Sequence, residues 1–126
     1  LTQGVELVIK ALAEATGGET FISKIPSFKI TDLAEAMLPG CKIQEIGIRP
    51  GEKLHEIMVT TEDSATTYEY DKHFIVYPQM TWNNKQQPNL RGKRVPDGFS
   101  YSSDNNTQWL SVEDIRELLK DVELEK

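Results

Sequence analysis

The residues with the clearest chemical potential lie in one short run, residues 48–56, with the sequence IRPGEKLHE. Arg49 is followed by a Pro-Gly pair and then by Glu52. The planar guanidinium of arginine suits phosphate oxygens and keeps its charge at physiological pH. A carboxylate three residues further on offers acceptors for both hydroxyls of a ribose. This run therefore predicts a site for a ligand with a phosphate and a sugar diol, although an ordinary surface ion pair uses the same residue types.

The backbone chemistry of the run supports a tight turn. Pro50 has a fixed φ and also restricts Arg49 to extended conformations. Gly51 supplies the conformational freedom that a tight turn requires. Because residues 41–48 have the composition of a strand, we expect the turn at a strand's carboxyl end, where α/β proteins place their ligands. The predicted site would bind one end of a nucleotide sugar, and it has no groups to transform it.

A search for catalytic groups elsewhere finds no constellation. His55 and His73 fall in different predicted elements, and for both we expect no catalytic role. With Cys41 as the single cysteine, no zinc-ligand spacing exists. The chain has neither a GxSxG motif nor a P-loop, and the glycine pair at 17–18 reads as a helix stop rather than a dinucleotide fingerprint. We therefore expect no catalytic residue, no metal and no bound cofactor in this chain.

The composition of the chain indicates which kinds of molecule it can bind and in which compartment it works. The chain has 126 residues, a net charge of −6 and a pI near 4.9. This acidic balance opposes a nucleic-acid partner, despite a small basic group between Lys85 and Arg94. No apolar run approaches the ~20 residues of a membrane-spanning helix. A single cysteine suits a reducing cytosol. The sequence opens without methionine, close to a helical pattern, which we interpret as a piece of a longer protein.

Ahead of the turn, helix and strand patterns alternate. The first helix is expected to end at the glycine pair at 17–18, and residues 20–25 predict a short strand. A second helix is predicted with Thr31 as its N-cap, followed by a strand over residues 41–48. This order favours an α/β fold. The apolar positions at helical spacing are Val5, Val8, Ile9, Leu12, Ile30, Leu33, Ala34, Met37 and Leu38.

Beyond the turn the pattern weakens and then recovers. Residues 54–60 fit either a strand or one helical turn, and residues 68–70 and 73–77 predict an antiparallel pair. Residues 79–110 show no period, and we expect an irregular arm that packs along a surface outside this chain, because disordered segments rarely carry so many aromatics. Plain disorder is the alternative. A last helix over residues 111–126 opens with a capping box of Ser111 and Asp114. The arm's aromatic residues are Trp82, Phe99, Tyr101 and Trp109.

Three blocks of the sequence together resemble a known family. They are KIPSFKITDLAEAM at 24–37, IGIRPGEKLHEIMVTTEDSATTYEYDKHFIVY at 46–77, and RVPDGFSYSSDNNTQWLSVEDIREL at 94–118. The chain resembles the C-terminal region of bacterial nucleotide-sugar dehydratases of the extended short-chain dehydrogenase/reductase superfamily. Within them it looks most like the inverting UDP-N-acetylglucosamine 4,6-dehydratases (5-epimerases). The last block is similar to the subset that serves capsule and O-antigen synthesis, with the pseudaminic acid pathway as the alternative.

The resemblance implies a fold, a division of labour and two site residues. The fold would be the substrate-binding part of a Rossmann-type enzyme, with a small mixed sheet, packed helices and a long irregular arm. Residues 1–78 would form the α/β substrate lobe, 79–110 the arm and 111–126 the C-terminal helix. Arg49 would contact the pyrophosphate of the UDP-sugar and Glu52 the uridine ribose.

The same resemblance implies what lies outside these residues. In this family an N-terminal Rossmann domain holds NADP and supplies a catalytic Tyr-x-x-x-Lys pair, so this chain would bind substrate without catalysing the reaction. The parent enzyme would be cytoplasmic and homo-oligomeric. A non-enzymatic interaction or oligomerisation module remains the other class of function to weigh.

Overall fold

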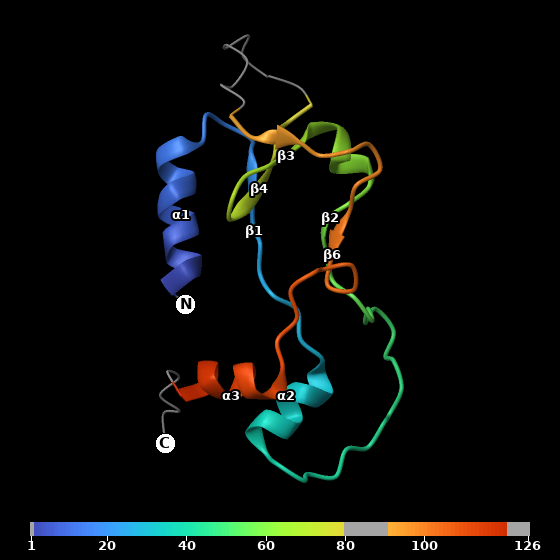
Figure 1. The fold of residues 1–126 in the computed structure, drawn as a ribbon. Coiled ribbons are helices and arrows are strands. Elements are labelled where there is room, and N and C mark those ends of the chain that lie inside the picture. The colour runs from blue at the N-terminus through green and yellow to red at the C-terminus, as the bar shows by residue number, and fades with distance from the viewer. Residues whose placement is uncertain (1, 80–90, 121–126) are drawn as a thin grey trace. The chain divides into compact units, whose positions relative to one another are not determined.

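The computed structural model describes residues 2–79 and 91–120, and Figure 1 shows their ribbon. The chain divides into two compact units, and each is built from two separate stretches. The first unit comprises Leu1–Lys24 and Ile57–Ser102, and the second comprises Ile25–Glu56 and Ser103–Lys126. The units are thus interleaved along the sequence. The functional division at residues 78 and 110 stays a prediction.

The first unit is organised around a four-stranded sheet with the order β1-β4-β3-β5. Every pairing between these strands is antiparallel, so the prediction of a mixed sheet is wrong. The physical reason is the short connection between β3 and β4, where Tyr70 N–H donates to His73 O at 2.9 Å. A parallel pair needs a crossover of a dozen or more residues. The strands are β1 (Thr20–Ser23), β3 (Thr67–Glu69), β4 (His73–Val76) and β5 (Lys93–Arg94).

A second, two-stranded sheet completes the strands of this unit. It pairs β2 (Ile57–Val59) with β6 (Tyr101–Ser102) in antiparallel register, with an irregularity between Ile57 and Val59. This settles the choice for residues 54–60 in favour of a strand. A 3-10 helix, η1 (Glu62–Thr66), connects β2 to β3.

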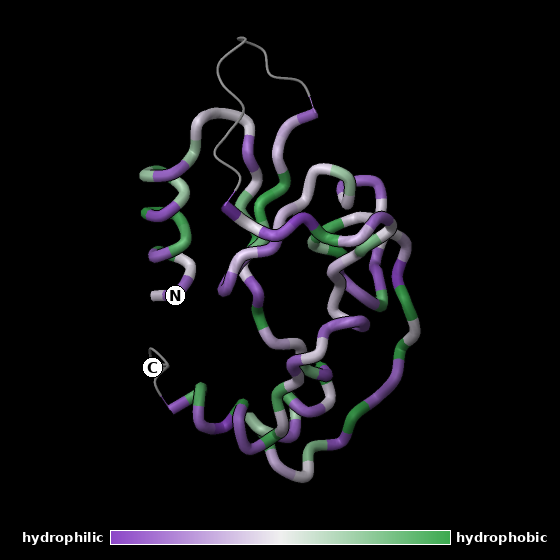
Figure 2. Tube along the Cα trace, turned by 45° about the horizontal axis from the view of Figure 1, so that its top comes forward, coloured by the Kyte–Doolittle hydropathy of each residue, from purple (hydrophilic) through white to green (hydrophobic). Residues whose placement is uncertain are grey.

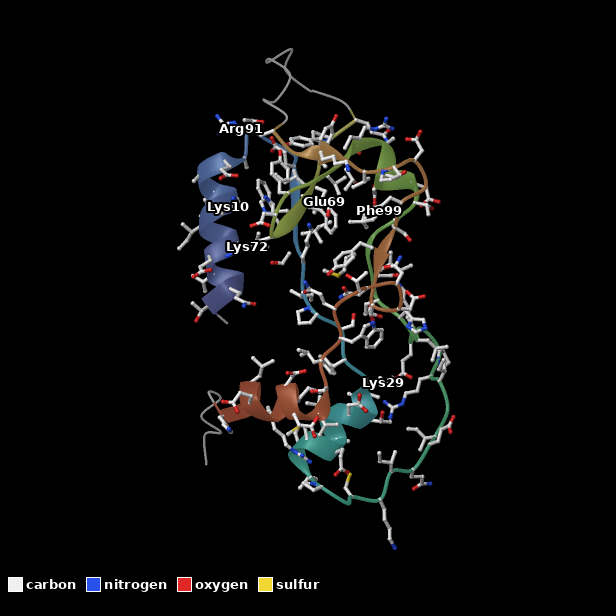
Figure 3. The ribbon with its side chains drawn as sticks, in the orientation of Figure 1. Lys10, Lys29, Glu69, Lys72, Arg91 and Phe99 are labelled. Carbon is white, nitrogen blue, oxygen red and sulfur yellow. The ribbon has the colours of Figure 1, made fainter. Side chains whose placement is uncertain are left out.

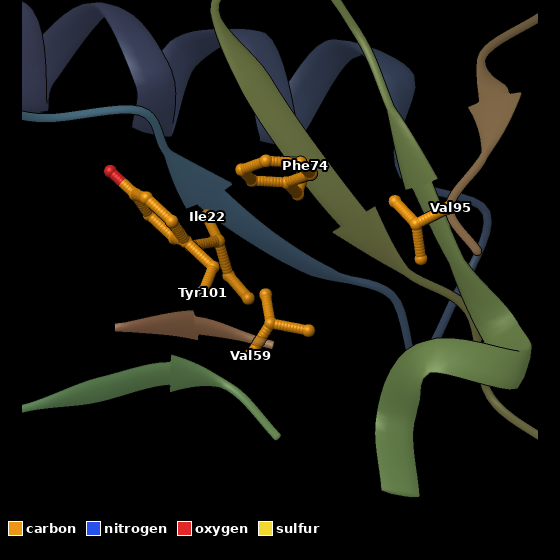
Figure 4. Packing of buried hydrophobic residues seen from close by; sticks show 5 residues of the cluster. All are labelled: Ile22, Val59, Phe74, Val95 and Tyr101. Atoms are coloured by element: carbon orange, nitrogen blue, oxygen red, sulfur yellow. The ribbon is translucent and has the colours of Figure 1, made fainter. Parts of the chain in front are cut away.

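The core of the first unit gathers side chains from distant parts of the sequence. Figure 4 shows five of its members, Ile22, Val59, Phe74, Val95 and Tyr101, packed together. Phe99, labelled in Figure 3, packs against Phe74 with 5.4 Å between ring centroids. Three of these residues belong to the predicted irregular arm.

The described part of that arm, residues 91–110, is therefore more ordered than predicted. It contributes the strands β5 and β6, because burial of Val95, Phe99 and Tyr101 outweighs the weak local propensity of the segment. Phe99 and Tyr101 pack in the core of this chain, and not along a surface that the chain lacks. Trp82 lies outside the described residues.

The first helix, α1 (Thr2–Glu14), forms where the sequence predicts it and ends before the glycine pair at 17–18. Its half-buried positions are Leu7 and Ala11, and α1 contacts β1. The predicted apolar stripe instead faces outward, with Val5, Val8, Ile9 and Leu12 between 49% and 80% exposed. Figure 2 shows apolar residues along this helix. A helix that is apolar on two sides is suited to burial between two layers.

The second unit pairs two helices, α2 (Ile30–Met37) and α3 (Val112–Lys120). The capping box of α3 is confirmed. The carboxylate of Asp114 accepts from Ser111 N–H at 2.9 Å, and Asp114 N–H donates to Ser111 Oγ at 3.1 Å. Hydrogen bonds from the backbone N–H and then from the hydroxyl of Ser111 lower the pKa of Asp114. The predicted end of this helix beyond Lys120 lies outside the described residues.

Two predictions for the second unit are wrong. Lys29, not Thr31, occupies the N-cap of α2 and makes no side-chain cap bond, because the helix already begins at Ile30. Residues 41–48 are not a strand. They have strand-like composition but pair with no described strand, and Ile43, Ile46 and Ile48 are 59% to 72% exposed. A strand needs a partner to satisfy its backbone groups, and composition alone does not supply one.

Candidate functional site

The turn predicted at residues 49–52 is present. Glu52 N–H donates to Arg49 O at 3.0 Å, which closes a four-residue turn. Gly51 has a φ of 87°, a value that side chains other than glycine rarely adopt. Proline at the second position and a positive φ at the third are the signature of a type II turn. The local sequence therefore determines this geometry without help from the rest of the chain.

The Glu52 side chain points back onto the backbone of the turn. One oxygen of the Glu52 carboxylate accepts from Arg49 N–H at 2.9 Å, and the other lies 3.9 Å from Arg49 Nε. The Arg49 side chain is 71% exposed and that of Glu52 is 50% exposed. The predicted arginine and acid are thus held together on one small surface that is open to solvent.

The electrostatics of the pair leave it available to a ligand. Exposed ion pairs contribute about 0–1 kcal/mol, because water screens both charges. A bidentate contact from arginine to phosphate is stronger than this single long contact. The free energy lost when Arg49 exchanges Glu52 for phosphate oxygens as its partner is therefore small. Glu52 can meanwhile keep its bond to the backbone and offer its second oxygen to a diol.

The rest of the run is solvent-exposed as well. Lys53, His55 and Glu56 are all exposed. Lys53 adds a second cation next to the turn in sequence. Among the described residues, the hydrogen bonds of residues 42–55 lie within the turn itself. The segment is therefore open to solvent on both sides of the turn.

The other candidate residues do not form a second site. His73 is buried in β4, stacked on Tyr70 with 4.8 Å between ring centroids and lying 6.0 Å from Phe21. Burial, reinforced by Lys10, lowers the pKa of His73. Its position between two aromatic rings fits a structural role. Cys41 is half-buried and is a free thiol.

Neither a metal nor a dinucleotide has an evident holder in the described residues. Over residues 2–79 and 91–120, no cluster of three or more His, Cys, Asp or Glu side chains could hold a metal ion. Gly17 and Gly18 follow the end of α1, so they do not form the turn from a strand into a helix that cradles a pyrophosphate. The described residues therefore do not fit NADP.

Sequence reasoning missed the residues that attach the site segment to the second unit. Ser103 contacts both backbone groups of Glu56, and Glu35 contacts Gly40 and Arg116. Ser103 is 47 residues from Glu56, and Arg116 is 81 residues from Glu35, so nothing in the local sequence indicates these contacts. Only the folded structure identifies them.

The fold is that of a small α/β chain, and the turn places Arg49 and Glu52 on an exposed surface. Residues 1–78 match the family described as "Polysaccharide biosynthesis protein", and the chain belongs to that family. The match with the inverting UDP-N-acetylglucosamine 4,6-dehydratase of Campylobacter jejuni is 43% identical over 129 residues. It covers 98% of this chain and 39% of that enzyme.

Two further relatives extend the comparison. A protein of Methanocaldococcus jannaschii named "uncharacterized membrane protein" is 32% identical, over 97% of this chain and 37% of its own length. The crystal structure of Pen from Bacillus thuringiensis superposes with a TM-score of 0.75 and is 34% identical, over 95% of this chain and 35% of that chain. The resemblance read from the sequence is thereby confirmed, and so is the α/β class. The chain spans little more than a third of the length of these relatives.

Proposed function

We propose that this chain is the nucleotide-binding part of a UDP-N-acetylglucosamine 4,6-dehydratase. The observation that carries the proposal is the open turn, in which Arg49 and Glu52 share one solvent-exposed surface. Its support is the 43% identity to the inverting enzyme of Campylobacter jejuni. In this proposal the guanidinium of Arg49 binds the pyrophosphate, and the carboxylate of Glu52 accepts from the ribose hydroxyls.

The proposed contribution of the chain is binding and orientation. In the complete enzyme, C4 of the hexose would lose a hydride and water would be eliminated across C5 and C6. The hydride would then return to C6, while C5 takes up a proton with inversion. Holding the UDP moiety fixes where the sugar ring lies against the reacting groups, and such positioning can lower a barrier by several kcal/mol. We assign NADP and the catalytic Tyr-x-x-x-Lys pair to the remainder of such enzymes, because the described residues of this chain do not fit a dinucleotide.

The biological setting is a finer part of the same proposal. The family description supports a role in polysaccharide synthesis. We favour the capsule or O-antigen branch, which leads to UDP-N-acetyl-L-fucosamine, over the pseudaminic acid branch. Among the described helices, none is long and apolar enough to cross a membrane. We propose that the enzyme lies in the cytoplasm, in the same compartment as its nucleotide-sugar substrate.

The exposed apolar surfaces favour a second contribution, which is docking. Val8, Ile9 and Leu12 on α1, and the isoleucines of residues 43–48, are each more than half exposed. We propose that the remainder of the enzyme, or a second subunit, covers them in the assembled protein. An interaction module without nucleotide binding is the competing function. It predicts an oligomer that is indifferent to UDP, which light scattering with and without UDP detects.

Calorimetry with UDP tests the proposed binding site. In a dehydratase that carries this chain, Arg49→Ala should weaken UDP binding by more than about tenfold, because a charge-assisted contact contributes roughly 1.5–3 kcal/mol. Arg91→Ala is the matched control, since Arg91 is an exposed arginine of the other unit. Equal UDP affinity in wild type and Arg49→Ala would refute the assigned role.

A further inference from the structure

The segment that carries the turn is held at two points and is open between them. The described residues 42–55 make hydrogen bonds only inside the turn, and all of their side chains are exposed. A turn on such a segment can hold a ligand against the rest of an enzyme only if its ends are fixed.

The end of the segment is fixed by Ser103. Ser103 Oγ accepts from Glu56 N–H at 3.1 Å, and Ser103 N–H donates to Glu56 O at 2.9 Å. Both backbone groups of Glu56 are thus engaged by one residue that is distant in sequence. Ser103 is half-buried, whereas Glu56 is exposed, so the more enclosed residue holds the more open one. Residues 53–55 alone separate this contact from the turn.

The start of the segment is fixed by Glu35. One oxygen of its carboxylate accepts from Gly40 N–H at 3.1 Å, and the other lies 3.7 Å from Arg116 Nη2. The same guanidinium nitrogen donates to Glu35 O at 3.3 Å. Gly40 follows α2 with a φ of 73°, where a side chain would be strained. Arg116 of α3 therefore holds Glu35 of α2, whose carboxylate in turn holds Gly40 at the start of the open segment.

We infer that Ser103 and the Glu35–Arg116 pair are positioning residues for UDP binding, acting through the two ends of residues 40–56 on the turn that carries Arg49. This inference rests on the proposed function. Neither group is expected to touch the nucleotide. They restrict the segment before UDP binds, so less conformational entropy is lost on binding. This is how preorganisation increases affinity.

The decisive variant is Ser103→Ala, which removes the hydroxyl acceptor and leaves the Ser103 N–H bond to Glu56 O. We expect UDP affinity to fall about three- to tenfold, the range for one net hydrogen bond. We also expect faster hydrogen exchange at the Arg49 and Glu52 amides. Ser103→Thr keeps a hydroxyl and should restore both readouts. Thr16→Ala is the matched control, because it deletes a hydroxyl bonded to Glu19 in the other unit.

The second variant, Arg116→Gln, tests the other end and covers the case in which Ser103→Ala does not fold. Like Ser103→Ala, it should reduce UDP affinity, and it should leave the hydrogen-exchange rates of the other unit unchanged. The inference fails if both variants keep wild-type UDP affinity while Arg49→Ala loses it. If Arg49→Ala also keeps wild-type affinity, the proposed function fails instead. Exchange at the Arg49 and Glu52 amides then decides separately whether the two anchors order the segment.

Discussion

Two turns of this chain share the same local chemistry and differ in what surrounds them. Residues 49–52 and residues 96–99 each close by a backbone bond between their first and fourth residues, at 3.0 Å and 3.1 Å. Each has a glycine with positive φ at its third position, Gly51 at 87° and Gly98 at 76°. Each is also accompanied by an arginine paired with an acid three residues later. Arg49 and Glu52 are the end residues of the first turn, whereas Arg94 lies two residues before the second turn and pairs with Asp97 inside it.

The groups of the second turn are used by the first unit. Gly98 N–H donates to Ser64 Oγ at 3.0 Å, and Arg94 Nε donates to Ala65 O at 3.3 Å. Phe99 packs against the ring of Phe74 in the core. Thus the arginine, the glycine and the last residue of this turn all contact η1 or the core. This turn therefore stabilises the first unit.

The groups of the first turn have no comparable use within the described residues. Apart from Glu52, no described residue forms an ion pair with Arg49, which is 71% exposed. An arginine and a specific glycine turn that stabilise nothing around them are better explained by a ligand than by the fold. The comparison therefore distinguishes a turn that holds the protein together from one that we propose holds a substrate.

The largest effect that tests this contrast is expected from Phe99→Ala. Because Phe99 is half-buried against Phe74, its loss should cost about 2–3 kcal/mol of unfolding free energy, somewhat below the range for fully buried Phe→Ala changes. Urea denaturation measures it. The counterpart Ile48→Ala, next to the first turn, should cost less than about 0.5 kcal/mol, since Ile48 is exposed. Equal losses would mean that the first turn is also a structural element.

A smaller and more selective effect is expected at the two glycines. An added Cβ meets no atom within 4 Å at either Gly51 or Gly98, so backbone strain alone acts in both cases. Gly98→Ala should lower the unfolding free energy by about 1 kcal/mol or more, because the strained turn belongs to the folded unit. Gly51→Ala should instead weaken UDP binding, with a smaller change in stability, because the open segment can relax.

Calorimetry and urea denaturation on both glycine variants separate these outcomes. If Gly51→Ala leaves UDP affinity unchanged, the geometry of the first turn is not needed for binding.

The sequence predicted local features well and non-local ones poorly. The Pro-Gly turn, the capping box of Ser111 and Asp114, and helix α1 each depend on residues close in sequence, and each is present. The strand expected over residues 41–48 is absent, because strand formation depends on a partner that composition does not reveal. The order found in residues 91–102 went unpredicted for the converse reason. Its strands are only two residues each and exist through long-range pairing and burial.

The candidate site shows the same limit. Arg49 and Glu52 were identified from type and spacing, since one turn determines their separation. Ser103, Glu35 and Arg116 were not, because their contacts depend on how α2, α3 and the segment ends meet in the second unit. The exposure of the α1 stripe was also unpredictable. Helical spacing shows that a face is apolar, but it does not show what covers that face.

The smallest expected effect is a pH dependence confined to the first unit. His73 is buried against Tyr70 and Phe21, and Nε2 of its ring is buried with no hydrogen-bond partner among the described residues. Burial, with Lys10 next in importance, lowers its pKa from the ordinary value of 6.5. The neighbouring charges are Lys10 and Glu14 of α1 and Lys24 after β1, and Glu14 opposes the two lysines only in part.

Because the folded pKa of His73 is the lower one, the unfolded chain takes up the proton first as pH falls. The stability that depends on neutral His73 is fully present above the unfolded pKa of about 6.5 and is lost as pH falls from there towards the folded pKa. Hydrogen exchange at pH 7 and about 5.5, above most carboxylate titrations, should therefore show weaker protection in β3 and β4 at the lower pH. Substitution His73→Phe should flatten this response. Ser103, Glu35 and Arg116, which hold the segment of the first turn, lie in the other unit. An equal loss of hydrogen-exchange protection at the Arg49 and Glu52 amides would therefore show that the two turns are coupled, and it would weaken the contrast between them.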